Sequence, residues 1–257
     1  MKAHRLKFTI AYEGTPWLGW QTLPSGRTVQ DALESALSKI AGVTVRIQGS
    51  GRTDAGVHAL GQVAHGDVPG DSRLGASDWT RALNAVLPAS IRVMRAEFAA
   101  ADFHARFDAK AKTYRYRIWR EDVMSPFEAG RAWHVYGTLD MAAMKRCAAL
   151  LRGRHDFSRL SANRGGVSDS KRREYPEDVT RTLTRVEIAE DHEVIEFEVE
   201  GDGFLYRMVR LIMGSLVHVA RGRASEDWFA SLLSAPDGVK SHHVAPPDGL
   251  YLVEVKY

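Results

Sequence analysis

Both halves of the chain alternate between segments with the period of a β-strand and segments with the period of an α-helix. Thr113–Trp119 alternates apolar side chains with arginines, which is the period of two that a strand with one buried face requires. Between Thr28, a candidate N-cap, and Ile40, apolar residues recur at helical spacing. The pattern predicts an α+β fold in which each half contributes both strands and helices.

The same periods locate the other elements. The expected strands are Lys7–Tyr12, Val43–Ile47, Gln62–Val68, Ile91–Phe98, Arg181–Ala189, Glu193–Glu200 and Leu250–Tyr257. The expected helices are Ser77–Ala85 with Ser77 as its N-cap, Leu139–Leu151, Tyr206–Ala220 and Ser225–Leu233. We therefore expect two related α+β subdomains, 1–107 and 108–257, and a long loop over Gly49–Gly61.

Composition excludes several classes of protein. The 257 residues include one cysteine, Cys147, so a disulfide within the chain and a cysteine-rich zinc site are both excluded. The ten histidines are scattered and there is no Walker loop, so we predict neither a metal nor a nucleotide cofactor. No apolar run approaches the ~20 residues of a membrane span, and the N-terminus lacks a signal peptide's apolar region. We expect a cytoplasmic protein with no membrane partner.

The glycine-framed segment Gly51–His58 carries the most chemical information. Gly51 and Gly56 flank Arg52-Thr53-Asp54 and permit backbone conformations closed to other residues. An aspartate in such a loop is commonly a turn-former that bonds its own backbone. A reactive carboxylate positioned by the preceding strand is the alternative.

Several motifs in a fixed order distinguish these alternatives. They are GRTDAGVHA from Gly51, Gly19-Trp20-Gln21, Thr28-Val29-Gln30, Gly61–His65, Leu83–Pro88, Asp102–Phe107, Tyr114-Arg115-Tyr116, Met208-Val209-Arg210, Gly214-Ser215-Leu216 and Gly249–Val253. Together they resemble the signatures of the tRNA pseudouridine synthase A family over nearly the whole chain. The resemblance implies the pseudouridine synthase fold: two related subdomains with antiparallel sheets that form a central mixed sheet and an RNA-binding cleft.

The resemblance also implies an activity and its residues. It makes Asp54 the catalytic residue that converts uridine to pseudouridine at positions 38 to 40 of the tRNA anticodon arm. It gives Arg210 the role of counter-ion to Asp54, Tyr114 that of a base contact, Leu250 that of an apolar wall and Arg52 that of an RNA contact. Core packing is the alternative for Tyr114 and Leu250. Whether Asp54 attacks covalently or abstracts a proton stays open.

Basic residues gather between His104 and Arg120, interleaved with aromatic residues. The side chains predicted to contact RNA are Arg106, Lys110, Lys112 and Arg115. A net charge of +3 also mildly favours an acidic partner such as nucleic acid. The polar loop 163–178 contains Lys171-Arg172-Arg173 and is either a solvated loop or an additional RNA clamp. By contrast Glu190–Asp202 carries seven acids and no Lys or Arg, and it should face away from phosphates.

Three functions remain to be compared. The first is a tRNA-modifying isomerase. The family resemblance implies that such an enzyme is a homodimer with tRNA as its partner. The second is a non-catalytic RNA-binding protein, against which the presence of Asp54, Tyr114 and Arg210 argues, because a pure binder gains nothing from a carboxylate near phosphates. The third is a synthase that acts on ribosomal RNA.

Overall fold

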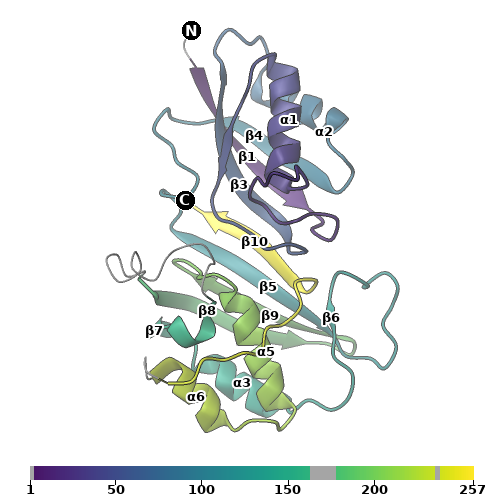
Figure 1. The fold of residues 1–257 in the computed structure, drawn as a ribbon, viewed down its shortest axis with the longest axis vertical. Coiled ribbons are helices and arrows are strands. Elements are labelled where there is room, and N and C mark those ends of the chain that lie inside the picture. Colours follow the sequence, from purple (N-terminus) through teal and green to yellow (C-terminus); the bar gives the residue numbers. More distant parts are fainter. Residues whose placement is uncertain (1–2, 163–177, 235–237) are drawn as a thin grey trace. The chain divides into compact units, whose positions relative to one another are not determined.

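The computed structural model describes residues 3–162, 178–234 and 238–257, and these form two compact units. Unit 1 comprises Met1–Thr113 and Leu250–Tyr257, and unit 2 comprises Tyr114–Gly249. The chain passes between the units within strand β5 (Ala111–Trp119), and strand β10 (Leu250–Lys256) returns to unit 1 (Figure 1). A division at 107/108 would place β10 in the second subdomain, whereas its pairing with β3 explains its place in unit 1.

The sheet of unit 1 has β1 (Ala3–Tyr12) between β4 (Ile91–Phe98) and β3 (His58–Pro69). Both of these pairings are antiparallel, whereas β10 adds to β3 in parallel and β2 (Ile47–Gly49) adds antiparallel. The strand β1 buries every second residue, from Leu6 to Tyr12, as the predicted period of two requires.

Two helices, α1 (Val29–Ala41) and α2 (Ala76–Val86), pack beside each other on this sheet (Figure 1). The predicted N-cap of α1 is confirmed, because the Thr28 hydroxyl accepts a hydrogen bond from the Asp31 amide at 3.2 Å. The predicted N-cap Ser77 of α2 is wrong. The helix begins one residue earlier, and Asp78 accepts a hydrogen bond from the Gly75 amide at 3.0 Å.

The segment around the glycine-rich loop also differs from expectation. The strand expected over Val43–Ile47 lies instead at Ile47–Gly49, because Ile47 pairs with Gly66 of β3. The following strand begins at His58, inside the expected loop, because Ala59 pairs with Tyr12. The loop that carries Asp54 is therefore only eight residues long, Ser50 to Val57.

Unit 2 contains a sheet with the strand order β5-β9-β8-β7, formed with β9 (Val194–Gly201), β8 (Thr180–Glu190) and β7 (Gly153–Asp156). The predicted hairpin is confirmed, since β8 and β9 pair antiparallel. The short strands β7 and β6 (Trp133–His134) were not predicted, because runs of four and two residues carry no readable period.

Among the described residues of unit 2, the α-helices α3 (Met141–Ala149), α5 (Met208–Ala220) and α6 (Glu226–Ser234) pack together over the strands β7 and β8 (Figure 1), and a short 3-10 helix, η1, spans Ser158–Leu160. Cys147 lies inside this layer, and burial raises the pKa of its thiol to about 11. A buried, protonated cysteine here is a packing residue. Within the described ranges, no helix is both long enough and apolar enough to cross a bilayer.

Candidate functional site

Asp54 lies in the loop that joins β2 to β3, between residues of contrasting exposure. The side chain of Thr53 is buried, Asp54 is half-buried and Arg52 is exposed. The Asp54 carbonyl accepts a hydrogen bond from the Val57 amide at 3.2 Å, which closes a turn behind the carboxylate. The loop thus combines a fixed backbone with a partly accessible acid and an accessible cation.

Thr53 attaches the loop to the interior of unit 1. Its hydroxyl lies 2.8 Å from the phenol oxygen of Tyr12, and its carbonyl accepts a hydrogen bond from the Trp20 amide at 3.1 Å. Burial raises the pKa of the Tyr12 phenol to about 12, so the phenol keeps its proton across the physiological range. The residue before Asp54 is therefore held through both its side chain and its backbone.

The N-terminal side of the loop is fixed by Gln62, which is fully buried in β3. The Gln62 amide nitrogen donates to the Gly51 carbonyl at 3.1 Å, and its oxygen accepts from the Ser50 hydroxyl at 2.7 Å. Buried amides that satisfy both ends in this way specify one conformation of the segment they bond. Gln62 belongs to the predicted strand, but its role in holding the loop was not predicted.

Two glycines upstream allow the chain to pass close behind the loop. Gly19 has φ +90°, and a Cβ there would lie 2.7 Å from the Thr53 carbonyl oxygen and 3.0 Å from the Asp54 carbonyl carbon. A Cβ on Gly14 would lie 2.1 Å from the Val57 carbonyl oxygen. The motif Gly19-Trp20-Gln21 therefore has a physical role in unit 1, because only glycine fits against the backbone at Asp54.

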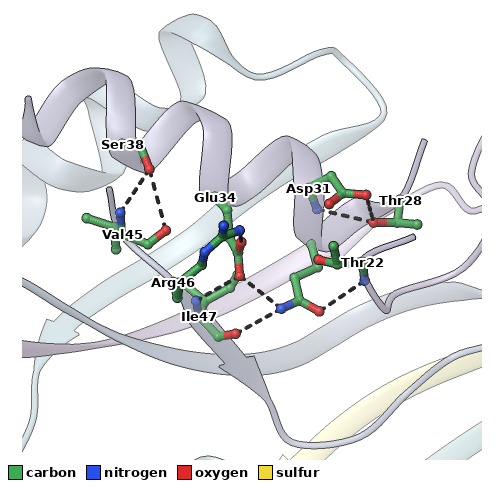
Figure 2. A network of polar contacts seen from close by, with 9 residues as sticks. Thr22, Thr28, Asp31, Glu34, Ser38, Val45, Arg46 and Ile47 are labelled. Atoms are coloured by element: carbon green, nitrogen blue, oxygen red, sulfur yellow. Dashed lines mark hydrogen bonds and ion pairs between the residues drawn. The ribbon is translucent and has the colours of Figure 1, made fainter. Parts of the chain in front are cut away.

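A polar network ties helix α1 to the strand that enters the loop (Figure 2). Glu34, which is 5% exposed, accepts hydrogen bonds from the Ile47 amide at 3.0 Å and the Arg46 guanidinium at 2.5 Å. The Gln30 amide nitrogen donates to both Glu34, at 2.9 Å, and the Ile47 carbonyl, at 3.0 Å. A buried carboxylate with several donors is an anchor, and this one fixes β2 immediately before the Asp54 loop.

Of the predicted RNA-contacting residues in unit 1, Lys112 contacts this loop, and Arg106 and Lys110 lie on the segment that precedes Lys112. The Lys112 ammonium donates to the Ser50 carbonyl at 2.7 Å, and a Cβ on Gly51 would lie 3.2 Å from that nitrogen. Arg106 and Lys110 are exposed on the segment that leads to Lys112. The structure therefore brings Lys112 to the base of the loop, and it places Arg106 and Lys110 on the surface nearby in the chain.

Leu250 begins strand β10 and is 6% exposed. The next residue, Tyr251, pairs with His58, where β3 leaves the Asp54 loop. The rings of Tyr251 and His58 stack with centroids 4.6 Å apart, and the His58 Nδ1 accepts a hydrogen bond from the Gly14 amide at 3.0 Å. Leu250 is thus buried beside the C-terminal end of the loop, consistent with either packing or a wall for a base.

Tyr114 and Arg210 belong to unit 2. Tyr114 is 8% exposed on β5, and its ring meets the ring of Phe204 edge-on at 4.8 Å. Arg210 is half-buried on helix α5, most of whose residues are apolar. The predicted ion pair between Arg210 and Asp54 joins residues of different units and stays a prediction.

Arg210 is hydrogen-bonded to the segment that precedes β10. The Arg210 Nε donates to the Ala245 carbonyl at 2.8 Å, and the Ala245 amide donates to the Arg210 carbonyl at 3.0 Å. A Cβ on Gly214, one turn further along α5, would lie 1.9 Å from the His243 carbonyl oxygen. Gly214 therefore lets this segment lie directly on the helix that carries Arg210.

The arginines of β5 have carboxylate partners in unit 2. Arg115 lies 3.0 Å from Glu198 and Arg117 lies 2.6 Å from Glu128, and both also approach Glu196. The acidic strand predicted to face away from phosphates thus supplies two of these partners. The alternation of β5 is confirmed, and it buries the aromatic residues Tyr114, Tyr116 and Trp119. The predicted RNA contact of Arg115 is not tested by this pairing.

The remaining site predictions concern absences and the loop 163–178. Residues 163–177 of that loop, with Lys171, Arg172 and Arg173, lie outside the described residues. Over the described ranges, no group of three or more His, Cys, Asp or Glu side chains is arranged to hold a metal ion. Sequence reasoning missed the contacts that Tyr12, Gln62 and Glu34 make around the loop. Gln62 belongs to the motif Gly61–His65, which does not indicate its hydrogen bonds to Ser50 and Gly51, and Tyr12 and Glu34 resemble ordinary strand and helix residues in sequence.

Known proteins resemble nearly the whole chain. Residues 9–108 and 147–257 match the family model described as tRNA pseudouridine synthase, a range that contains Asp54 and Arg210 but not Tyr114. A protein named tRNA pseudouridine synthase A from Akkermansia muciniphila is 48% identical over 98% of this chain and 95% of its own length. Proteins of the same name from Solidesulfovibrio magneticus and Geobacillus kaustophilus are 45% and 42% identical over 98% of this chain, and over 91% and 94% of their own lengths.

Proposed function

The chain belongs to the tRNA pseudouridine synthase family, and from this premise we propose that it modifies uridines 38 to 40 of the tRNA anticodon stem-loop, with Asp54 as its catalytic residue. Family membership itself establishes the coarser statement, that the chain is an isomerase that converts uridine in tRNA to pseudouridine. The observation that carries the role of Asp54 is the set of hydrogen bonds on its loop, which fix Gly51, Thr53 and Gly56 around one half-buried carboxylate.

The reaction exchanges one bond of the base for another. The bond from ribose C1′ to N1 of uracil breaks, a bond from C1′ to C5 forms, C5 loses its proton and N1 gains one. A carboxylate serves such a reaction either as a nucleophile or as a base. In both routes Asp54 must reach the nucleotide in a defined orientation, which a loop anchored on either side of it provides.

The other site residues are proposed to act on the same nucleotide. Tyr114 contacts the uracil ring, Leu250 provides an apolar wall and Arg210 supplies a positive charge for the reacting groups. Arg52 contacts the RNA backbone, since its exposed guanidinium stays protonated and cannot act as a base. Support for these roles comes from the matching motifs and, for Arg210, from the two hydrogen bonds with Ala245 that limit its movement.

The RNA outside the target nucleotide is proposed to contact Arg106, Lys110, Lys112 and Arg115. We further propose that the enzyme is a cytoplasmic homodimer in which tRNA contacts both copies, and that its halves divide the work, with residues 1–107 carrying the catalytic loop and residues 108–257 completing the site. These proposals rest on the family resemblance and on the exposure of Arg106 and Lys110.

The test is a map of pseudouridine at nucleotide resolution in an unmodified tRNA transcript after incubation with the enzyme. We expect product at positions 38 to 40. Product confined to other positions would overturn the site assignment, and an active preparation that modifies ribosomal RNA in preference to tRNA would favour the ribosomal alternative. Absence of product from a folded enzyme would contradict the assignment of this activity.

Two substitutions test the catalytic role of Asp54. Asp54→Asn keeps the shape of the side chain and removes its charge, and Asp54→Ala removes both. We expect either change to abolish turnover while the affinity for tRNA stays within a few-fold of wild type. Asp71→Asn is a matched control, because this exposed aspartate lies in a turn beyond β3. Equal turnover by Asp54→Asn and wild type would exclude a catalytic carboxylate.

A further inference from the structure

Phe107 is an exposed aromatic residue on a turn of unit 1. The residue is 75% exposed, although one side of its ring stacks on His104 with centroids 4.2 Å apart and planes 28° from parallel. The Phe107 amide donates to the His104 Nδ1 at 3.2 Å, and Asp108 accepts from the His104 amide at 2.8 Å. The ring is therefore presented to solvent in a fixed orientation rather than on a free side chain.

The turn that carries Phe107 is attached to the strand that leads into the catalytic loop. The His104 Nε2 lies 2.9 Å from the Gln48 side-chain oxygen, on β2. At the other end of the segment, the Lys112 ammonium donates to the Ser50 carbonyl at 2.7 Å. Residues 104–112 are thus held at both ends against residues 48–50, which immediately precede Arg52 and Asp54.

The charges around the ring favour an anionic partner. Arg106 lies with its guanidinium carbon 5.7 Å from the centroid of the Phe107 ring, and Lys110 is exposed on the same segment. Within the described ranges, neither cation forms an ion pair with a carboxylate. The acid beside the ring, Asp108, is engaged by the His104 amide. The exposed ring has one cation, Arg106, beside it and a second, Lys110, three residues further along the same segment. This combination matches the chemistry of a single-stranded nucleotide, whose base stacks and whose phosphate pairs with a cation.

We propose that Phe107 is a stacking platform for an unpaired base of the RNA substrate, and that Arg106 and Lys110 contact the phosphates beside that base. The base is not the target uridine but a nucleotide near it in the folded RNA, because the platform lies on the segment attached to the start of the catalytic loop. This inference rests on the proposed RNA substrate and adds a binding site separate from Asp54.

The experiment compares four variants in binding to an unmodified tRNA transcript over a range of salt concentrations. Phe107→Leu keeps the apolar volume and removes the aromatic ring, whereas Phe107→Trp keeps an aromatic face. Phe127→Leu is the control, because Phe127 is a similarly exposed phenylalanine, at 81%, in unit 2. Arg106→Gln measures the electrostatic contribution separately.

We expect Phe107→Leu to raise the Kd for tRNA by about fivefold to a hundredfold, the range that the loss of one stacked base gives. The slope of log K against log salt should not change, because no charge is lost, whereas Arg106→Gln should reduce that slope by about one. Phe107→Trp and Phe127→Leu should bind within about twofold of wild type. Because the chain has six tryptophans of its own, the signal of the added indole is the difference in emission between Phe107→Trp and wild type, and tRNA should quench that difference.

Several outcomes overturn the platform. They are unchanged affinity of Phe107→Leu, an added indole whose emission is insensitive to tRNA, and a loss of affinity that is accompanied by a change in oligomer mass on light scattering. The last outcome would identify Phe107 as a contact between copies of the chain. The fluorescence measurement remains decisive if Phe107→Leu folds poorly. Failure of the proposed function can be distinguished from failure of the platform. The proposed function fails if wild-type enzyme makes no pseudouridine, and the platform fails if the Phe107 variants bind tRNA as wild type does.

Discussion

The phenol oxygen of Tyr12 and the hydroxyl oxygen of Thr53 lie 2.8 Å apart in the interior of unit 1. Tyr12 is the last residue of β1, so this hydrogen bond connects the central part of the sheet to the residue that precedes Asp54. Since the Thr53 carbonyl also accepts from the Trp20 amide, two separate parts of unit 1 determine where the Asp54 backbone lies. The backbone of the loop that carries Asp54 is therefore positioned by hydrogen bonds from β1 and from the segment at Trp20.

Removing that hydrogen bond should affect catalysis more than binding. Tyr12→Phe leaves the ring in place and removes the phenol oxygen from Thr53. We expect a loss of about 1 kcal/mol in the free energy of unfolding, and a lower kcat with little change in KM, because Asp54 is less well oriented. Chemical denaturation and single-turnover assays measure the two effects. Tyr136→Phe, at a residue that is 66% exposed, should change neither, and a Tyr12→Phe enzyme with wild-type kcat would contradict the positioning role.

The network in Figure 2 predicts an order of stabilities. Glu34→Ala removes the acceptor of the buried Ile47 amide and should cost about 1–3 kcal/mol of folding free energy. Arg46→Gln should cost less than Glu34→Ala, because 74% of the Arg46 side chain is exposed and the pair is screened by solvent. Urea denaturation of both variants gives the comparison. Equal losses would show that the ion pair, rather than the backbone hydrogen bond, is the anchor.

Local features of this chain could be predicted from the sequence, whereas features that depend on long-range pairing could not. The cap of α1 at Thr28 and the alternation of Thr113–Trp119 were readable, because both depend on residues within one turn or one strand. The start of β3 at His58 could not be predicted from the sequence, because it is set by pairing with Tyr12 and Tyr251, which lie near opposite ends of the chain.

The same distinction applies to the candidate site. Asp54 was found through an eight-residue motif, which is local. Glu34 is indistinguishable in sequence from an exposed helix residue, and its burial follows from β2 passing over α1. The sequence also made the positive charge between His104 and Arg120 look larger than it is in the folded chain. Arg115 pairs with Glu198 on another strand and Arg117 pairs with Glu128, more than ten residues away, and neither pairing is visible in the sequence. Charge clusters read from sequence count cations without the carboxylates that folding brings to them.

The ion pair of Asp67 and Arg5 predicts a pH dependence of stability. The Arg5 guanidinium donates to both carboxylate oxygens, at 2.8 and 2.9 Å, and it holds the pKa of Asp67 below its ordinary value of 3.8. A depressed carboxyl pKa stabilises the fold above the unfolded-state value, and that contribution is lost as the pH falls through the folded pKa. The stabilisation is therefore present above pH ~4 and declines in more acidic solution.

Asp67→Asn tests this dependence. The side chain of Asp67 is 48% exposed, so we expect the variant to be less stable than wild type by up to about 1 kcal/mol at pH 7. The difference should narrow as the pH is lowered from about 4 towards 2, where wild-type Asp67 is itself protonated. Denaturation midpoints across this range provide the measurement, with Asp71→Asn as the exposed control. A difference that stays constant with pH would exclude the ion pair as its cause.

Substitution of Gly214 tests whether the segment around His243 must lie directly against the helix that carries Arg210. An alanine Cβ there would lie 1.9 Å from the carbonyl oxygen and 2.5 Å from the carbonyl carbon of His243, and both are backbone atoms that cannot rotate away. In an exposed helix the same change would be favourable by about 1 kcal/mol. We expect Gly214→Ala to destabilise the enzyme by about 1–3 kcal/mol, because the clash outweighs the gain in helix propensity.

The activity of Gly214→Ala then tests the proposed role of Arg210. Moving the segment around His243 away from α5 strains the two hydrogen bonds between Arg210 and Ala245, so the guanidinium is less restricted. We expect kcat to fall even at temperatures where the variant is fully folded by circular dichroism. Ser215→Ala is the matched control, because it removes the 2.7 Å hydrogen bond to Ser241 on the same segment without adding an atom. If both variants are destabilised but keep wild-type kcat, the segment serves folding alone and Arg210 needs no such restraint.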